Sequence, residues 1–147
     1  MRKFYFDTSV LLPVLIQEHE NHTVCKELLR GALKNGTALT SATHAYAELY
    51  RHLTKNKPPY NLLPKEASTA VVDNMGKLLE IVATDREDYE RAIARCVALN
   101  LTGAVIYDAL HLEAALKAGA EILYSDNLRD FTRLVIEDDA IEIVGVR

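Results

Sequence analysis

The sequence predicts an α/β sandwich built around a mainly parallel sheet. Short apolar runs alternate along the chain with longer segments whose apolar residues recur at the period of an α-helix, and this alternation is typical of parallel sheets. A chain of 147 residues with 49% hydrophobic side chains can bury one core without disulfides or a structural metal. We therefore expect a single domain over residues 1–147.

Five apolar runs are the expected strands, and they cover residues 3–6, 38–40, 80–82, 121–124 and 141–146. Five segments with helical periodicity lie between them. The first spans residues 24–33 and stops at Asn35-Gly36, and the second runs from Ala42 to the breaker at residues 57–59. The third follows Pro64, the fourth begins at the capping-box pattern of residues 84–87, and the fifth covers residues 107–118.

Composition narrows the class of protein. The formal net charge of −4 and the isoelectric point of about 5.7 argue against a protein that coats nucleic acid over its whole surface, although they leave room for a local basic patch. The longest apolar stretch, residues 10–16, is too short to span a bilayer and no signal sequence precedes it, so we expect a soluble cytoplasmic protein without membrane association. Cys25 and Cys96 lie on apolar helical stripes, which predicts buried free thiols.

Two carboxylates directly follow expected strands. Asp7 comes after the run at residues 3–6, and Asp126 lies in the polar segment 125–131 that follows the run at residues 121–124. Parallel sheets bind ligands at the carboxyl ends of their strands, so both residues are candidates for a functional site. An Asp at a strand exit is also a common N-cap of the next helix, and each residue taken alone is open to that interpretation.

Glu48 lies about 100° from the centre of the apolar stripe of its expected helix, at the shoulder of the buried face. Its neighbours on the helix surface are basic or titratable, and they are His44, Arg51, His52 and Lys55. Glu48 can therefore form an exposed ion pair with Arg51. Alternatively, it is an acid at the edge of a site, with phosphate-attracting residues beside it.

Asp108 lies among apolar residues in the segment YDALHLEAA, so we expect its carboxylate to be at least partly buried. Burial favours the protonated acid unless a cation, a hydrogen-bond donor or a helix N-terminus compensates. The alternative is a charge placed at the start of a helix, where it interacts favourably with the helix dipole.

Several common motifs are absent. The five histidines show no HExxH or other paired-ligand spacing, so a zinc site is not expected. No GxGxxG, GxxxxGK[ST] or GxSxG motif occurs, which disfavours a nucleotide-binding loop and a serine-hydrolase elbow.

Four short motifs, taken in order, resemble those of the PIN domain family, as found in the VapC-type toxin ribonucleases. They are Asp7-Thr8-Ser9 after the first strand, Glu48 in ATHAYAELYR, Asp108 in YDALHLEAA and the acidic loop of residues 125–131. The match runs from residue 3 to residue 146. The resemblance implies a five-stranded parallel sheet flanked by helices on both faces. It also implies an endoribonuclease site, dependent on Mg²⁺ or Mn²⁺, where the acids converge.

Through this resemblance, catalytic and metal-binding roles are expected for Asp7, Glu48, Asp108 and Asp126. The chemistry of the residues supports such a site, because clustered carboxylates repel one another and hard divalent cations with oxygen ligands keep them ionised. Asp7 and Asp108 are the metal ligands of first choice. Glu48 is expected to be a third ligand or the group that positions water.

The last motif departs from the family pattern. Asn127 stands where the family often has its fourth acid, which leaves Asp126 or Asp130 as a substitute. Asn carries no charge, so a second metal would bind more weakly, and we expect one well-held ion. Ser9 and Ser125 can support the site by hydrogen bonding a ligand carboxylate or a water, or they can cap helices.

The resemblance further implies an RNA substrate, a cognate antitoxin protein and a homodimer. Basic residues near the lips of the expected site are candidates for RNA backbone contacts, and they are Arg51, His52, Lys55, Lys57, Arg129 and Arg133. Asn127 also keeps a second hypothesis open, in which the PIN fold is catalytically weak or inert and serves as a binding module.

Overall fold

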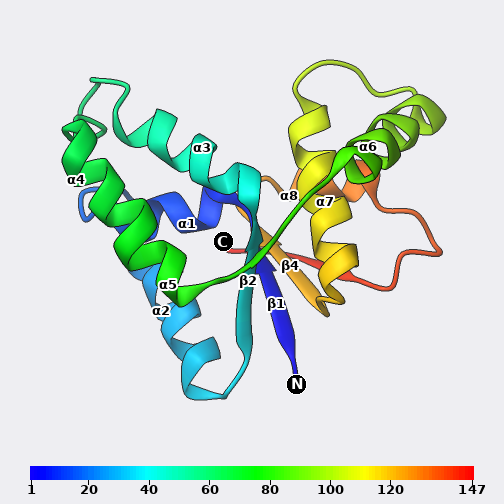
Figure 1. The fold of residues 1–147 in the computed structure, drawn as a ribbon. Helices are drawn as coiled ribbons and strands as arrows, with labels where there is room; N and C mark the ends of the chain where they lie inside the picture. Colours follow the sequence, from blue (N-terminus) through cyan, green and yellow to red (C-terminus); the bar gives the residue numbers. More distant parts are fainter.

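The computed structural model describes residues 1–147 and shows a five-stranded, all-parallel sheet between two layers of helices (Figure 1). The strands are β1 (Lys3–Phe6), β2 (Ala38–Ala42), β3 (Glu80–Val82), β4 (Ile122–Ser125) and β5 (Glu142–Gly145). Their order in the sheet is β3-β2-β1-β4-β5, which places β1 at the centre. The predicted α/β class and five strands are confirmed, and the sheet is wholly rather than mainly parallel.

The central strand divides its side chains between two cores. Phe4 and Phe6 pack into the core beneath the first layer of helices, whereas Tyr5 packs into the core on the opposite face. This division follows from the alternation of side chains along a strand. Both faces of β1 are buried from Phe4 to Phe6, which accounts for its three consecutive aromatic residues. The end of this strand fixes where Asp7 lies.

The first layer consists of α1 (Thr8–Leu15), α2 (His22–Lys34), α3 (Thr43–Leu53), α4 (Pro64–Ser68), the π-helical segment η1 (Thr69–Met75) and α5 (Gly76–Leu78). The last three follow one another without a break and form the helix predicted after Pro64. Helix α1 is not among the predicted helices. Most of its side chains are buried and Pro13 lies inside it, so it shows neither an amphipathic stripe nor a proline-free run.

The second layer consists of α6 (Arg86–Leu99), α7 (Val105–Ala118) and α8 (Leu128–Leu134). The predicted capping box at residues 84–87 is wrong by one position, because Asp85 is the N-cap of α6 and exchanges backbone and side-chain hydrogen bonds with Asp88. Helix α8 was expected to be an acidic loop. Its seven residues are mostly polar, and only Phe131 and Leu134 are buried.

Two further features of the fold bear on the predictions. Cys25 and Cys96 are both buried and unpaired, as predicted. No helix of the protein has the length and apolar character needed to cross a membrane.

Asp88 ties the start of α6 to α7. Its carboxylate is fully buried and accepts hydrogen bonds from the backbone of Asp85, from Lys117 at 2.8 Å and from Arg91. Burial alone would favour the protonated acid, but the hydrogen bonds from Lys117 and Asp85 outweigh it and lower the pKa of Asp88 to about 2. The ionised carboxylate therefore stabilises the fold.

We expect Asp88→Asn to reduce the acid sensitivity of the protein. A carboxyl whose pKa is lower in the folded state contributes stability above its unfolded pKa of about 4, and this contribution is lost as the pH falls toward about 2. The substitution should therefore cost about 2 kcal/mol at neutral pH and roughly half of that near pH 3. Urea unfolding at both pH values measures the difference. An equal loss of unfolding free energy at the two pH values would contradict the lowered pKa of Asp88.

Candidate functional site

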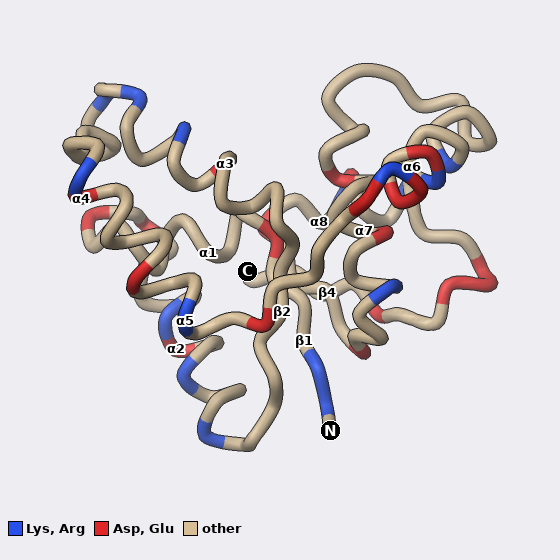
Figure 2. Tube along the Cα trace, viewed as in Figure 1, with Lys and Arg blue, Asp and Glu red and all other residues tan.

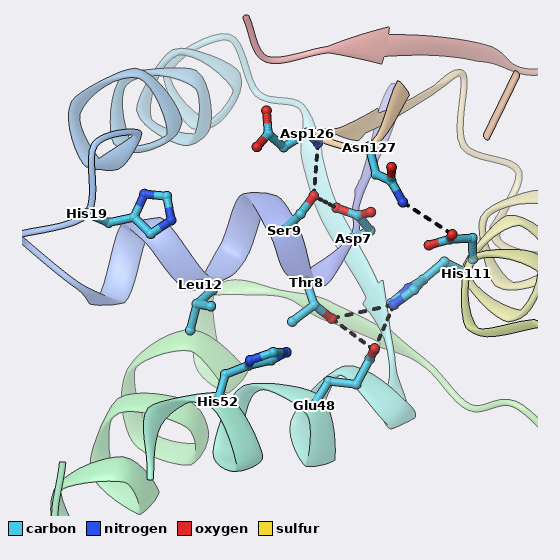
Figure 3. Close-up of a pocket in the computed structure, with 11 residues that line it drawn as sticks. Asp7, Thr8, Ser9, Leu12, His19, Glu48, His52, His111, Asp126 and Asn127 are labelled. Atoms are coloured by element: carbon cyan, nitrogen blue, oxygen red, sulfur yellow. Dashed lines mark hydrogen bonds and ion pairs between the residues drawn. The ribbon is translucent and has the colours of Figure 1, made fainter. Parts of the chain in front are cut away.

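A polar cavity of about 300 Å³ opens where β1 and β4 end, between α1, α3 and α7 (Figure 3). Only one of its 11 lining residues is hydrophobic. The four acids predicted from the sequence, Asp7, Glu48, Asp108 and Asp126, all line it, together with Asn127. Residues separated by up to 120 positions are thus brought together by the parallel topology, which places successive strand exits at one edge of the sheet.

The side chain of Asp7 is held by two serines. Asp7 is the N-cap residue of α1, but its side chain makes no capping hydrogen bond. Instead, its carboxylate accepts hydrogen bonds from Ser9 at 2.5 Å and from Ser125 at 2.7 Å. The carboxylate is thus oriented within the cavity and does not cap the helix.

The two serines also join the exits of β1 and β4. The backbone N–H of Asp126 donates to Ser9 Oγ at 2.9 Å, and that of Asn127 donates to Ser125 Oγ at 2.8 Å. Burial raises the pKa of Asp7, and the charge of His111 and the serine hydrogen bonds oppose this effect. The site therefore contains a buried acid whose ionisation is only partly compensated by the protein.

Glu48 reaches the cavity from α3 and is anchored by residues of two other helices. Its Oε1 accepts a hydrogen bond from Thr8 at 2.9 Å and lies 2.8 Å from Nε2 of His111. Burial disfavours the ionised form, but the contacts with His111 and Thr8 outweigh it and lower the pKa of Glu48. The alternative ion pair with Arg51 does not form. Glu48 is thus an ionised acid that faces the cavity.

His111 is a site residue that the sequence analysis did not identify. It is 2% exposed, lies on α7, and its Nδ1 is 2.7 Å from the hydroxyl of Tyr5 on β1. Its Nε2 contacts Glu48, so Tyr5, His111 and Glu48 form a chain that links the central strand, α7 and α3. Its position three residues after Asp108 places both side chains on one helical face, and this spacing was the available signal.

Asp108 lies in the first turn of α7 and is partly buried, as predicted. Burial, together with the negative charges of Asp7 and Asp130, raises the pKa of Asp108 to about 7. Its carboxylate makes no ion pair, and its one side-chain hydrogen bond comes from Asn127 Nδ2 at 3.3 Å. Asp108 thus lies near the negative charge of Asp7 and forms no ion pair of its own, which is the arrangement that a bound divalent cation relieves.

The β4–α8 turn separates Asp126 from Asp130. Asp126 faces Arg147, whose guanidinium donates to its carboxylate at 3.0 and 3.1 Å, and Asn21 donates to it at 3.3 Å. Asn127 Nδ2 donates to Asp130 at 2.8 Å as well as to Asp108. Asp130 also has a charge partner, because Arg133 donates to it at 2.7 Å. Asp126 therefore lines the cavity, whereas Asp130 lies outside the lining and is connected to Asp108 through Asn127.

Exposed basic residues lie beside the cavity. Lys and Arg positions gather at the far end of α3 and in the loop that follows it, at the upper left of Figure 2. The candidate RNA contacts Arg51, Lys55, Lys57 and Arg129 are all exposed. Lys55 lies over the ring of Tyr60 at 4.3 Å from the ring centroid, and Arg51 lines a second cavity of about 540 Å³ that shares Glu48 and His52 with the first.

Known proteins resemble this chain in sequence and in fold. The family model of the PIN domain matches residues 4–136. The Mycobacterium tuberculosis protein named Ribonuclease VapC40 is 30% identical over 137 residues, which cover 92% of this chain and 96% of that protein.

Among solved structures, Mycobacterium tuberculosis VapC20, described as a sarcin-ricin loop cleaving toxin, superposes with a TM-score of 0.71 at 14% identity, covering 91% of this chain and 97% of that one. VapBC2 from Rickettsia felis, solved with a DNA fragment of its promoter, gives a TM-score of 0.67 at 16% identity, covering 97% and 98% of the two chains. Both solved structures therefore have the same fold as this chain.

Proposed function

Because the chain belongs to the PIN domain family, and to its VapC type, we propose that it is a Mg²⁺- or Mn²⁺-dependent endoribonuclease and the toxin of a toxin–antitoxin pair. One observation carries the proposal: carboxylates from separate elements line a single polar cavity, in which the charge of Asp7 helps to raise the pKa of Asp108. The names of the relatives support RNA as the substrate.

The residues present fit a hard divalent cation. The cavity offers carboxylate, hydroxyl and amide oxygens, which are the ligands that Mg²⁺ and Mn²⁺ prefer. Asp7 and Asp108 would hold the ion, with Glu48 as a third ligand or as the group that positions water. Asp126 or Asp130 would complete the set. When bound, such an ion lowers the pKa of a coordinated water and offsets the charge that develops on the leaving oxygen.

The chain's own residues contribute orientation and proton transfer. Ser9 and Ser125 fix the direction of the Asp7 carboxylate, and Thr8 and His111 fix that of Glu48. Glu48 is ionised at neutral pH, so it can accept the proton of a water that attacks a phosphodiester. Arg51 and Lys55 are available to hold the RNA backbone beside the cavity.

We also propose a cognate antitoxin and a homodimer as partners. The structural neighbours include VapBC complexes, in which a toxin of this fold is solved with its antitoxin. An antitoxin side chain that carries positive charge would be attracted to the acidic cavity, because it would supply the cation that Asp108 lacks. Such a contact would block the site directly.

Metal removal tests the proposed reaction. We expect EDTA to abolish cleavage of a fluorescently labelled RNA, and Mg²⁺ or Mn²⁺ to restore it, because the carboxylates cannot perform the reaction without the ion. Cleavage should be restored equally in Asp138→Asn, which changes an exposed acid outside the cavity. Cleavage that persists at full rate in EDTA would refute metal dependence. Absence of cleavage with every metal and RNA tested would favour the inert binding module.

The fourth acid can be assigned with a matched pair of variants. Each acid is paired with an arginine, Asp130 with Arg133 and Asp126 with Arg147. Only Asp130 is also linked to Asp108, through the side chain of Asn127. We therefore expect Asp130→Asn to raise the Mn²⁺ concentration needed for half-maximal cleavage by about tenfold, and Asp126→Asn to raise it less. Measurement of rate against Mn²⁺ concentration ranks the two. The reverse order would assign the ligand to Asp126, the other acid that the sequence left open.

A further inference from the structure

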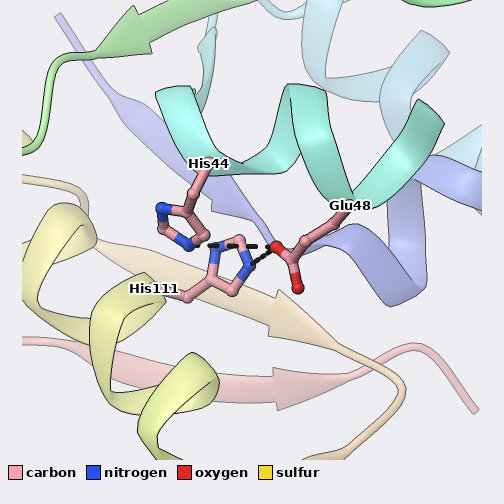
Figure 4. A group of neighbouring side chains, drawn as sticks. All are labelled: His44, Glu48 and His111. Atoms are coloured by element: carbon pink, nitrogen blue, oxygen red, sulfur yellow. Dashed lines mark hydrogen bonds and ion pairs between the residues drawn. The ribbon is translucent and has the colours of Figure 1, made fainter. Parts of the chain in front are cut away.

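Next to the carboxylate cavity lies a second group of metal-ligating side chains. His44 and Glu48 from α3 and His111 from α7 point toward one another (Figure 4). One ligand atom from each residue lies within 4.8 Å of the other two, with 2.8 Å between His111 Nε2 and Glu48 Oε1 and 3.9 Å between His44 Nε2 and Glu48 Oε1. Their positions in the sequence, 44, 48 and 111, follow no zinc motif, so only the fold reveals the group.

His44 has no other evident role. Both of its ring nitrogens are buried, and neither has a hydrogen-bond partner, although buried polar atoms in native proteins are nearly always paired. Its ring lies 4.1 Å from that of His111, measured between centroids.

His111 is oriented as metal-binding histidines usually are. Its Nδ1 contacts the Tyr5 hydroxyl at 2.7 Å, which leaves Nε2 directed at Glu48. In metal sites, the second ring nitrogen of a ligating histidine is held in this way, and the partner fixes both the ring and its tautomer. Tyr5 is fully buried on the central strand, so the support is rigid.

We propose that His44, Glu48 and His111 form a binding site for a zinc-class transition-metal ion, and that its occupation withdraws Glu48 from the acidic cavity. Two imidazoles and one carboxylate are a ligand set that suits Zn²⁺, with a fourth position open to water, whereas the all-oxygen set around Asp7 and Asp108 suits Mg²⁺ or Mn²⁺. Binding requires a free lone pair on His111 Nε2, so a proton on that nitrogen would move to Nδ1, where the Tyr5 hydroxyl can accept a hydrogen bond from it, or would be released to solvent. The second half of the proposal rests on the proposed ribonuclease function, but the binding itself does not.

Zinc binding is measured calorimetrically on the full chain, without a histidine tag and after removal of bound metals. We expect one saturable Zn²⁺ site per chain at micromolar metal. Affinity should fall by at least about tenfold in His44→Gln. It should stay within about threefold in Asp7→Asn/Asp108→Asn, which removes the carboxylate site but keeps the three ligands. His52→Gln is the matched control, because His52 lies on the same helix and has a buried unpaired nitrogen but is outside the group.

Circular dichroism of each variant verifies folding, and the visible absorption of Co²⁺ gives a second readout, since a tetrahedral histidine site gives intense bands that His44→Gln should abolish. Absence of saturable Zn²⁺ binding overturns the proposal. So does binding that is lost in Asp7→Asn/Asp108→Asn but kept in His44→Gln, because the ion would then use the acidic cavity. Binding lost in His52→Gln but not in His44→Gln would also overturn it.

The consequence for activity is tested separately. Zn²⁺ should inhibit Mg²⁺-supported RNA cleavage, and His44→Gln should raise the inhibitory Zn²⁺ concentration by at least about tenfold, with each rate expressed relative to the zinc-free rate of the same variant. Inhibition that is unchanged in His44→Gln overturns the withdrawal of Glu48. If no RNA is cleaved under any condition, the proposed function fails, while the calorimetric result still decides whether the zinc site exists.

Discussion

Replacing Asp7 with Asn is expected to lower metal-dependent RNA cleavage by at least about 100-fold, because a ligating carboxylate contributes several kcal/mol to stabilising the transition state. Asp7 is the acid that the fold orients most firmly, with Ser9 and Ser125 donating to its two oxygens. Asn retains the size of the side chain but loses the charge. Single-turnover rates over a range of Mn²⁺ concentrations separate weaker metal binding from a slower chemical step.

The same variant should not weaken the metal-free protein through its loss of charge. Burial raises the pKa of Asp7, so the ionised form is disfavoured in the folded state at neutral pH, and Asn removes that cost. We therefore expect the midpoint of thermal unfolding in EDTA to stay equal or rise, while added Mn²⁺ no longer raises it. A variant that still cleaves RNA within about tenfold of the normal rate would exclude Asp7 as a metal ligand.

Arg95→Met is expected to destabilise the fold by about 3 kcal/mol, because it removes the closest cation of Glu113 and Asp139 and leaves Glu113 with Arg91 alone, at 3.7 Å. Arg95 on α6 donates to Glu113 on α7 at 2.9 Å, to Asp139 at 2.7 Å and to the backbone carbonyl at the end of α8. Glu113 is only 7% exposed. One side chain thus joins the three helices of the second layer to the loop before β5.

Urea unfolding measures this effect, and Arg86→Met provides a matched control on the same helix. Arg86 pairs with Glu90 at 3.7 Å in an exposed position, where such pairs contribute less than about 1 kcal/mol. The double variant Arg95→Met/Glu113→Leu should recover part of the loss, since it removes the uncompensated carboxylate as well. Equal losses of stability in Arg95→Met and Arg86→Met would show that the ion pairs of Arg95 stabilise the fold no more than an exposed ion pair does.

The predictions that succeeded from sequence were those with local causes. β1 and β3 have the predicted bounds, because short apolar runs in an α/β chain are typical of buried strands. Asp7 and Asp126 were placed at one edge of the sheet by a general rule for parallel strands, and the cavity lies there. The partial burial of Asp108 followed from its apolar neighbours in the sequence.

The helices that were missed lack the signals on which sequence analysis depends. Helix α1 is buried on most sides and contains Pro13, so periodicity and proline both argue against it. Helix α8 is short and begins among Asp and Asn residues that are typical of turns. In both cases the surrounding sheet and helices stabilise an element that its own residues favour only weakly.

The contacts of the site could not be predicted because they are not local. His111 meets Tyr5 and Glu48 across 106 and 63 residues of chain. The pairing of Asp126 with Arg147 and the contact of Asn127 with Asp108 join residues 21 and 19 positions apart, and both depend on the path of the β4–α8 turn. The sequence therefore predicted which acids line the cavity, whereas the structure shows which of them have charge partners.

The hydrogen bond from Ser125 to Asp7 also determines when the site can form as the chain is synthesised. These residues are 118 positions apart, and β4 pairs with β1 in the sheet, so the acid from the first strand is fixed only after the fourth has been added. During synthesis, the residues before β4 can collapse and pair β1 with β2, yet Asp7 still lacks its second serine. A chain that ends before Ser125 therefore cannot hold the Asp7 carboxylate in the orientation that it has in the complete fold.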